Sequence, residues 1–204
     1  MSDETDYIAQ HKRRLSWMPW LYFALKDEQR GWARAWQAEL QATLVALEQV
    51  TLGENVFISP EAQLFAEPQR AIAIGSGSGI AADVFMHGPI TLGERVSVNA
   101  RVSMDGGRAG ITIGDGTRIA TGAKLFAFDH GMDPTAEVMS QPVTSRGIRI
   151  GSDVWVGADA GITDGVTLGD HVVVGMGAVV TRDFPDWAIV AGSPARVIGD
   201  RRDR

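Results

Sequence analysis

An aliphatic residue returns every six positions along most of this 204-residue chain. These positions fall into six groups of three, and every member is Leu, Ile, Val or Met. Six is a multiple of the two-residue strand period, so these side chains all point to one face of their strands. The groups are Leu52/Ile58/Leu64, Ile74/Ile80/Met86, Leu92/Val98/Met104, Ile113/Ile119/Leu125, Ile150/Val156/Ile162 and Leu168/Val174/Val180.

Glycine supports the same register, because the residue after the first member of every group is glycine. These glycines are Gly53, Gly75, Gly93, Gly114, Gly151 and Gly169. Pairs such as Glu-Asn, Asp-Gly and Ser-Asp, which tolerate tight turns, lie between the aliphatic positions. Short strands and turns in this order predict an all-β, three-sided coil of eighteen residues with an aliphatic interior. Extra residues fall after the third member of a group, at one corner, and the longest insertion is 129–149. A β-sandwich would lack this fixed six-residue phase.

Composition excludes several functions. Nineteen Lys and Arg against 25 Asp and Glu give a net charge of −6, which does not provide the basic surface of a nucleic-acid-binding protein. The absence of cysteine excludes disulfides and thiolate metal sites. The apolar run at 15–25 contains a proline and a serine and is too short to span a membrane. Acidic residues precede its basic flank, which is unlike a signal peptide, so a cytoplasmic protein without a membrane span is predicted.

A different period appears in residues 1–50. Trp32, Trp36, Leu40, Leu44 and Leu47 recur at spacings of three and four, as in the apolar stripe of a helix. We expect this segment to be a helical cap over the open first coil. A second interpretation is an aromatic helix that recognises the acceptor or touches a membrane.

The repeat resembles the hexapeptide-repeat acyltransferases over about residues 51–199, most specifically over 147–199. That stretch is similar to the sugar O-acetyltransferases of the maltose, galactoside and polysaccharide-modifying branches. The resemblance implies a left-handed parallel β-helix of about six three-sided coils, with the acetyltransferase domain at 51–192 and a CoA-contacting tail at 193–204. It also implies a homotrimer with active sites between subunits, acetyl-CoA as donor and no metal.

His130 is the candidate catalytic residue, because it lies five residues after Leu125 at the start of the long insertion. The resemblance places the family's catalytic histidine at this step. Acetyl transfer to a hydroxyl needs a base, and imidazole, with an ordinary pKa of about 6.5, suits this role. Asp129, Asp133 and Glu137 are alternative partners for orienting the ring. His11 and His171 are expected to be solvated.

Four residues are candidates for acceptor binding. Asn99 matches an acceptor-binding asparagine of the galactoside and maltose enzymes, although asparagine is also simply a good turn residue. Asp105 is shifted by about one place from acidic residues of those enzymes. His87 occupies the equivalent corner one coil earlier. Glu137 precedes Pro142 and Val143, where some family members carry a glutamate.

The resemblance also implies that coenzyme A lies along a groove between subunits, against small residues of the later coils. Arginine charges there suit its phosphates. Trp155 fits this site or a subunit interface equally well. The residues implied are Trp155, Ala158, Met176, Ala178, Thr181, Arg182, Ser193, Pro194 and Arg196.

These features predict an acetyl-CoA-dependent O-acetyltransferase that acts on a sugar or polysaccharide precursor. Two other functions stay open: N-acetylation of an amino sugar or small amine, and a non-catalytic trimeric scaffold. A carbonic anhydrase on this fold would need two histidines on one short stretch, and the sequence has no such pair.

Overall fold

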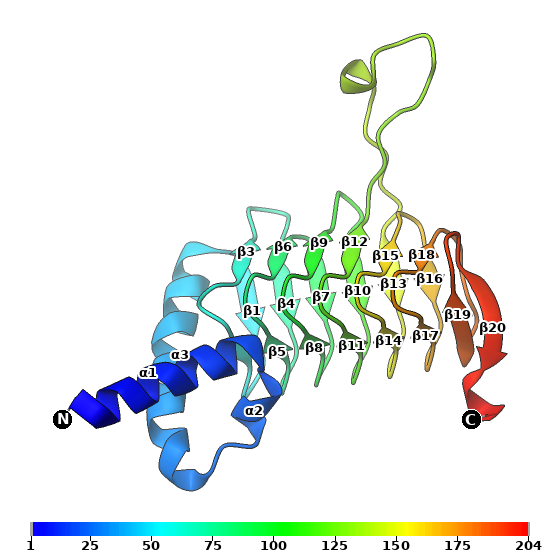
Figure 1. Ribbon diagram of the computed structural model, residues 1–204. Coiled ribbons are helices and arrows are strands. Elements are labelled where there is room, and N and C mark those ends of the chain that lie inside the picture. The colour runs from blue at the N-terminus through cyan, green and yellow to red at the C-terminus, as the bar shows by residue number, and fades with distance from the viewer. Residues whose placement is uncertain (1, 204) are drawn as a thin grey trace.

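The computed structural model describes residues 2–203, and its strands wind into a β-helix that follows three helices (Figure 1). The helices are α1 (Ser2–Trp17), α2 (Trp20–Phe23) and α3 (Asp27–Leu47). Sheet A contains β1 (Val50–Leu52), β4 (Ile72–Ile74), β7 (Ile90–Leu92), β10 (Ile111–Ile113), β13 (Ile148–Ile150) and β16 (Thr167–Leu168). Sheet B contains β2 (Phe57–Ile58), β5 (Gly79–Ile80), β8 (Ser97–Val98), β11 (Arg118–Ile119), β14 (Trp155–Val156), β17 (Val173–Val174), β19 (Ala188–Ala191) and β20 (Arg196–Asp200). Sheet C contains β3 (Gln63–Phe65), β6 (Phe85–His87), β9 (Ser103–Asp105), β12 (Lys124–Phe126), β15 (Gly161–Ile162) and β18 (Val179–Val180).

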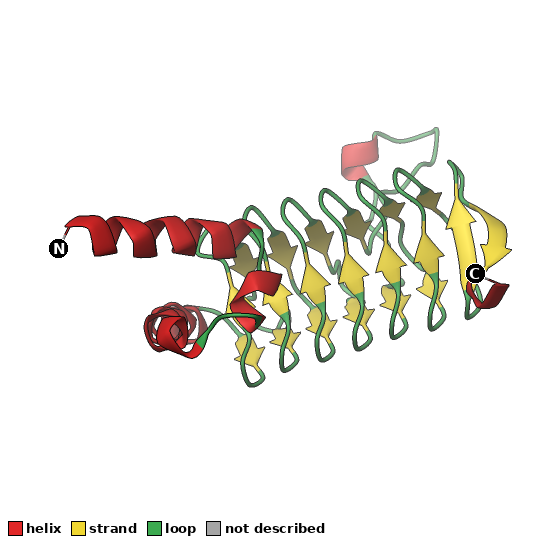
Figure 2. Ribbon diagram, turned by 60° about the horizontal axis from the view of Figure 1, so that its bottom comes forward, coloured by secondary structure: helices red, strands yellow, loops and turns green. Residues whose placement is uncertain are grey.

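The predicted fold, a left-handed parallel β-helix with an N-terminal helical segment, is confirmed (Figure 2). Each strand pairs in parallel with the strand one coil further on, as Val98 does with Ile119. All the repeat positions except Leu52 are buried, and Leu52 packs against the edge of the same core. The six-residue period therefore identifies the interior of the coil directly.

The glycine that follows each first repeat position allows neighbouring coils to approach closely. A Cβ atom on Gly75 would overlap the carbonyl of Gly93 and the amide nitrogen of Glu94 in the next coil. At the same corner, the Glu94 N–H donates to Oδ1 of Asp115, over 2.8 Å. Backbone contact between coils leaves no room for a side chain at these positions.

Helix α3 covers the open edge of the first coil through two glutamines. The Gln37 side chain accepts from the Ile58 N–H (2.8 Å) and donates to the Ile58 carbonyl (2.9 Å). Gln41 donates to the carbonyl of Val56 over 2.7 Å. The Gln37 amide thus replaces the missing neighbouring strand. At the end of the stripe Leu47 is 78% exposed, which corrects its expected burial, because α3 ends there.

At the other end, β20 pairs antiparallel with β19, and the 3₁₀-helix η2 (Arg201–Asp203) follows. The predicted insertion at 129–149 leaves the coil after β12 and projects well away from it (Figure 1). The chain rejoins the coil at Ile148, where β13 begins, so the loop is two residues shorter than predicted. Asp129 and Thr144 exchange two backbone hydrogen bonds of 2.9 Å at its neck. Its outer part contains the 3₁₀-helix η1 (Val138–Ser140). Over residues 2–203 we find no helix that combines the length and apolarity needed to cross a bilayer.

Candidate active site

His130 lies just past the neck of the projecting loop, and its side chain is exposed. Its ring meets the Phe128 ring edge-on, with centroids 5.9 Å apart. Within residues 2–203 neither ring nitrogen of His130 makes a hydrogen bond. The imidazole is therefore accessible to a ligand, and this chain does not itself orient it.

The three loop carboxylates considered as partners of His130 are directed elsewhere. Asp129 faces the Arg146 guanidinium at 3.9 Å. Asp133 accepts hydrogen bonds from the Thr135 hydroxyl (2.6 Å) and N–H (2.8 Å), which hold the pKa of its carboxyl below the usual range. Glu137 precedes η1 and is exposed. Within residues 2–203 none of the three forms a hydrogen bond or an ion pair with the His130 ring.

His87 and Asp105 lie side by side on sheet C and line a groove at the base of the loop. They are register partners on β6 and β9, and His87 Nδ1 is 3.1 Å from Asp105 Oδ2. The groove has a volume of about 540 Å³ and also includes Phe128, Thr144 and Ser145. Two of the predicted acceptor-binding residues are thus brought together next to the strand that leads to His130.

Two residues that sequence reasoning missed complete this cluster. Glu67 lies 3.1 Å from His87 Nε2, and Arg70 donates to Asp105 over 3.2 Å. A hydrogen bond from its own backbone, and then one from His87, hold the pKa of the Glu67 carboxyl below its usual value. Both ring nitrogens of His87 face carboxylates, and Nδ1 also lies 3.2 Å from a guanidinium nitrogen of Arg70. A signal for both residues exists in the sequence, because residues 67–70 lie at the same corner as the long insertion.

Asn99 lies on a different face, at the end of β8 in sheet B. It lines a groove with Arg118, Trp155 and Arg201. The Oδ1 atom of Asn99 is buried and has no hydrogen-bond partner in the part of the chain that the structure describes. The structure therefore separates Asn99 from the His87–Asp105 groove within one chain.

The residues implied for coenzyme A lie on the later coils and on the segment that leads into β20. Ala158 and Met176 lie at successive turns, where the Gly177 N–H donates to the Ala158 carbonyl over 2.8 Å, and Met176 is 78% exposed. The side chain of Ala178 points into the core, so only the outer side of this turn can face a ligand. The exposed members of this set are Trp155, Met176, Thr181, Arg182, Ser193, Pro194 and Arg196.

His171 differs from its expected solvated state. It has the positive φ of a turn residue (64°), but its ring stacks on Trp187 with centroids 3.9 Å apart. Its Nδ1 lies 2.9 Å from Asp153, and that hydrogen bond is the main cause of the lowered pKa of the Asp153 carboxyl. His11 is also half-buried, next to Tyr7. Both histidines have packing roles.

Comparison with known proteins agrees with this architecture. The family described as the hexapeptide repeat of succinyl-transferase matches residues 147–182. Galactoside O-acetyltransferase of Escherichia coli is 30% identical over 172 residues, which cover 82% of this chain and 72% of that enzyme. A putative lipopolysaccharide biosynthesis O-acetyl transferase of the same species is 32% identical over 60% of this chain and 66% of its own length.

Among solved structures, AntD, an N-acyltransferase from Bacillus cereus in complex with dTDP and 3-hydroxybutyryl-CoA, superposes with a TM-score of 0.70. It is 27% identical, and the match covers 81% of this chain and 88% of AntD. This chain belongs to the hexapeptide-repeat acyltransferase family and is an acyl-CoA-dependent acyltransferase.

Proposed function

We propose that this protein transfers an acetyl group from acetyl-CoA to a hydroxyl of a sugar or polysaccharide precursor in the cytoplasm. The observation that carries the proposal is the exposed imidazole of His130, which lies beside a groove lined by hydrogen-bonding side chains. The galactoside O-acetyltransferase relative supports the choice of a sugar hydroxyl.

His130 acts as the general base in this proposal. The ring takes the proton of the acceptor hydroxyl while the oxygen attacks the thioester carbonyl. The C–S bond then breaks, and coenzyme A leaves as a thiol that receives the proton from His130. Asp105 accepts a hydrogen bond from a neighbouring hydroxyl of the acceptor, since its carboxylate oxygens have spare lone pairs, and His87 positions that carboxylate. Asn99 and backbone N–H groups stabilise the negative charge that develops on the carbonyl oxygen. Glu137, in the outer part of the loop, is the remaining residue proposed to bind the acceptor.

The residues of the later coils suit the donor. The successive turns at Ala158 and at Met176–Ala178 leave their outer sides open, near the exposed Trp155, for the pantetheine arm. Arg182, after β18, and Arg196, at the start of β20, are exposed cations that suit phosphates, which need charge-assisted hydrogen bonds. Thr181, Ser193 and Pro194 border the same region. Acetyl-CoA supplies the activated acetyl group when it is bound.

A complete site needs a second copy of the chain. His130 lies on the loop beside sheet C and Asn99 lies on sheet B, so one copy does not unite them. We propose a homotrimer in which the sheet B face of one subunit meets the loop of its neighbour. Closed threefold symmetry then creates three equivalent sites.

The test of this function is His130→Ala. Loss of the general base is expected to lower kcat by about 10²–10⁴-fold. The mass of the assembly and its Tm should not change, because the side chain is exposed and makes no hydrogen bond in residues 2–203. Met132→Ala, an exposed site in the same loop, is the matched control. Turnover retained in His130→Ala would contradict the proposal.

N-acetylation is the second candidate function. AntD is an N-acyltransferase, and the carboxylates of Glu67 and Asp105 beside the groove would attract an ammonium group. Competition between an amino sugar and its N-acetylated form separates the two reactions. O-acetylation predicts that both forms accept the acetyl group, whereas N-acetylation predicts that only the free amine does.

A further inference from the structure

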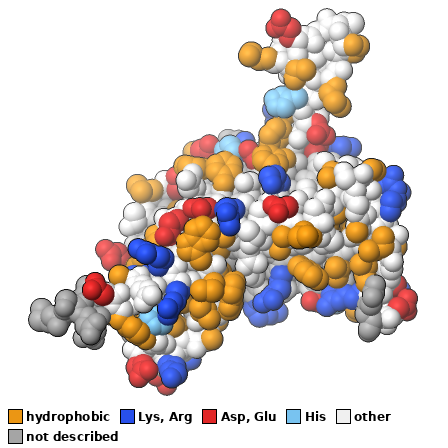
Figure 3. Space-filling view, in the orientation of Figure 1, with side chains coloured by type: hydrophobic (Ala, Val, Ile, Leu, Met, Phe, Trp, Pro, Cys, Tyr) orange, Lys and Arg blue, Asp and Glu red, His pale blue; other side chains and the backbone are white. Residues whose placement is uncertain are grey.

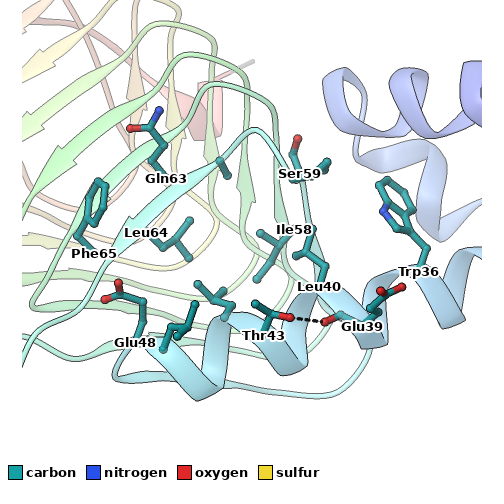
Figure 4. A pocket seen from close by; sticks show the side chains of 14 residues that line it. Trp36, Glu39, Leu40, Thr43, Glu48, Ile58, Ser59, Gln63, Leu64 and Phe65 are labelled. Carbon is teal, nitrogen blue, oxygen red and sulfur yellow. Dashed lines mark hydrogen bonds between the residues drawn. The ribbon is translucent and has the colours of Figure 1, made fainter.

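An apolar groove lies at the N-terminal end of the β-helix, between α3 and the first coil (Figure 4). Its volume of about 610 Å³ is in the range of small-molecule sites. The carboxylates of Glu39 and Glu48 are part of its wall, and no Lys, Arg or His contributes to it in the described residues. Its apolar lining is formed by Trp36, Leu40, Leu44, Leu47, Ile58, Pro60, Ala62, Leu64 and Phe65.

Aromatic rings continue from this groove along the outer face of sheet C. Phe65 lines the groove and is 43% exposed, and its ring centroid lies 5.9 Å from that of Phe85 on the next strand. The ring of Phe85 lies 6.5 Å from the His87 ring. Figure 3 shows hydrophobic side chains and a histidine at the base of the projecting loop. These rings form a path from the α3 groove to the loop groove.

The loop groove completes the path to the proposed base. His87 and Phe128 both line this groove. The Phe128 ring packs edge-on against the His130 ring, with ring centroids 5.9 Å apart. Between β3 and β12 there are three strand-to-strand steps of about 4.8 Å, so the path is roughly 14 Å long before the loop is reached. A single sugar ring does not cover this length.

Polar side chains accompany the rings on the same face. Gln63, Ser103 and Lys124 point outward from β3, β9 and β12, because they alternate with the buried Leu64, Met104 and Leu125. Aromatic faces with amide, hydroxyl and ammonium groups nearby suit the apolar faces and hydroxyls of a glycoside. The α3 groove beyond them is apolar with acidic residues in its wall, so it suits an uncharged tail and disfavours an anionic one.

We propose that the acceptor is an amphiphilic glycoside. This inference rests on the proposed function. The sugar of the glycoside occupies the loop groove beside His130, and its uncharged apolar tail follows Phe85 and Phe65 into the α3 groove. Helix α3 then has two roles, since it closes the first coil and selects the acceptor.

The experiment uses methyl, butyl and octyl glycosides of glucose, galactose and N-acetylglucosamine, below their critical micelle concentrations, with acetyl-CoA. Burial of apolar surface predicts that kcat/KM rises at least about tenfold from methyl to octyl. The double variant Leu47→Gln/Phe65→Ser should reduce that octyl-to-methyl ratio to about one. Val45→Gln is the matched control, because Val45 is exposed on α3 outside the groove and should keep the ratio.

Each result decides the inference. Equal kcat/KM for methyl and octyl glycosides in the wild type overturns it and leaves the proposed function standing. The inference is also overturned if the wild type forms an assembly larger than a trimer that the double variant does not form, because the groove then binds a second copy of this chain. Failure of the proposed function would show as no acetylation of any glycoside. Calorimetry with octyl glycoside then tests the tail site. Binding to the wild type and to Val45→Gln, but not to the double variant, supports the site. Absence of binding to the wild type overturns it.

Discussion

The stacked coils and the loop at 129–149 are held in place by different forces. The coils bury a continuous column of aliphatic side chains and share backbone hydrogen bonds with two neighbours. The loop is largely exposed, and the Gln141 side chain ties it together, accepting from the Asp133 N–H (2.8 Å) and donating to the Asp133 carbonyl (3.0 Å). Stability is therefore concentrated in the coils, and the proposed chemistry in a loop that the coils position.

The largest effect on stability is expected for Gly75→Ala. The added methyl group would meet the backbone of Gly93 and Glu94, which belongs to the next coil and has little freedom to move. We expect a loss of about 3 kcal/mol in the free energy of unfolding, measured by urea denaturation. Gly161→Ala is the control, because nothing beyond its chain neighbours lies within 4 Å of the position that a Cβ atom would occupy there. Equal effects at both sites would contradict the close-packing explanation.

Gln37→Ala tests how the first coil is closed. The change leaves the Ile58 N–H and carbonyl buried beneath α3 without the amide that pairs with both. We expect a loss of about 2 kcal/mol in unfolding free energy. Glu39→Ala, at an exposed position of the same helix, should change stability by less than about 0.5 kcal/mol. An unchanged Tm in Gln37→Ala would show that α3 does not close this edge.

The smallest change is expected for Gln141→Ala, and it should affect activity alone. Loss of the bonds to Asp133 loosens the loop that carries His130, so kcat/KM should fall about tenfold. Tm should stay constant, since the loop is outside the core. Met139→Ala, at an 89% exposed position in the same loop, should have no effect. A lower Tm in Gln141→Ala would mean that loop and coils are not independent.

The same contrast explains what the sequence can predict. Each coil repeats one environment, so the period alone identifies the buried face and the corner with insertions. The pairing of Gln37 with Ile58 has no period, and it depends on where α3 docks. Glu67 and Arg70 lie between β3 and β4, at a corner whose path the repeat does not determine. His171 is recognisable as a turn residue, but its stacking on Trp187 joins residues that are adjacent only after folding.

The site itself can be predicted only residue by residue. The step of six from Ile119 to Leu125 leads to His130, and the same register pairs His87 with Asp105. The separation of Asn99 from these residues follows from its sheet, which a one-dimensional pattern does not reveal. In the proposed homotrimer a second chain completes the surroundings of His130, and no pattern within one chain encodes that contact.

Mixed assemblies test most directly whether the active site is shared between two copies. Asn99→Ala is expected to lower kcat by about 10²–10³-fold, and His130→Ala by at least as much. In trimers formed from equal amounts of both variants, about one quarter of the interfaces unite an intact His130 with an intact Asn99. Selecting doubly tagged trimers removes the parental trimers, and each remaining mixed trimer has one such interface in three, so the account predicts recovery of about a third of wild-type activity. Mixed trimers as inactive as their parents would contradict a site shared between these two residues.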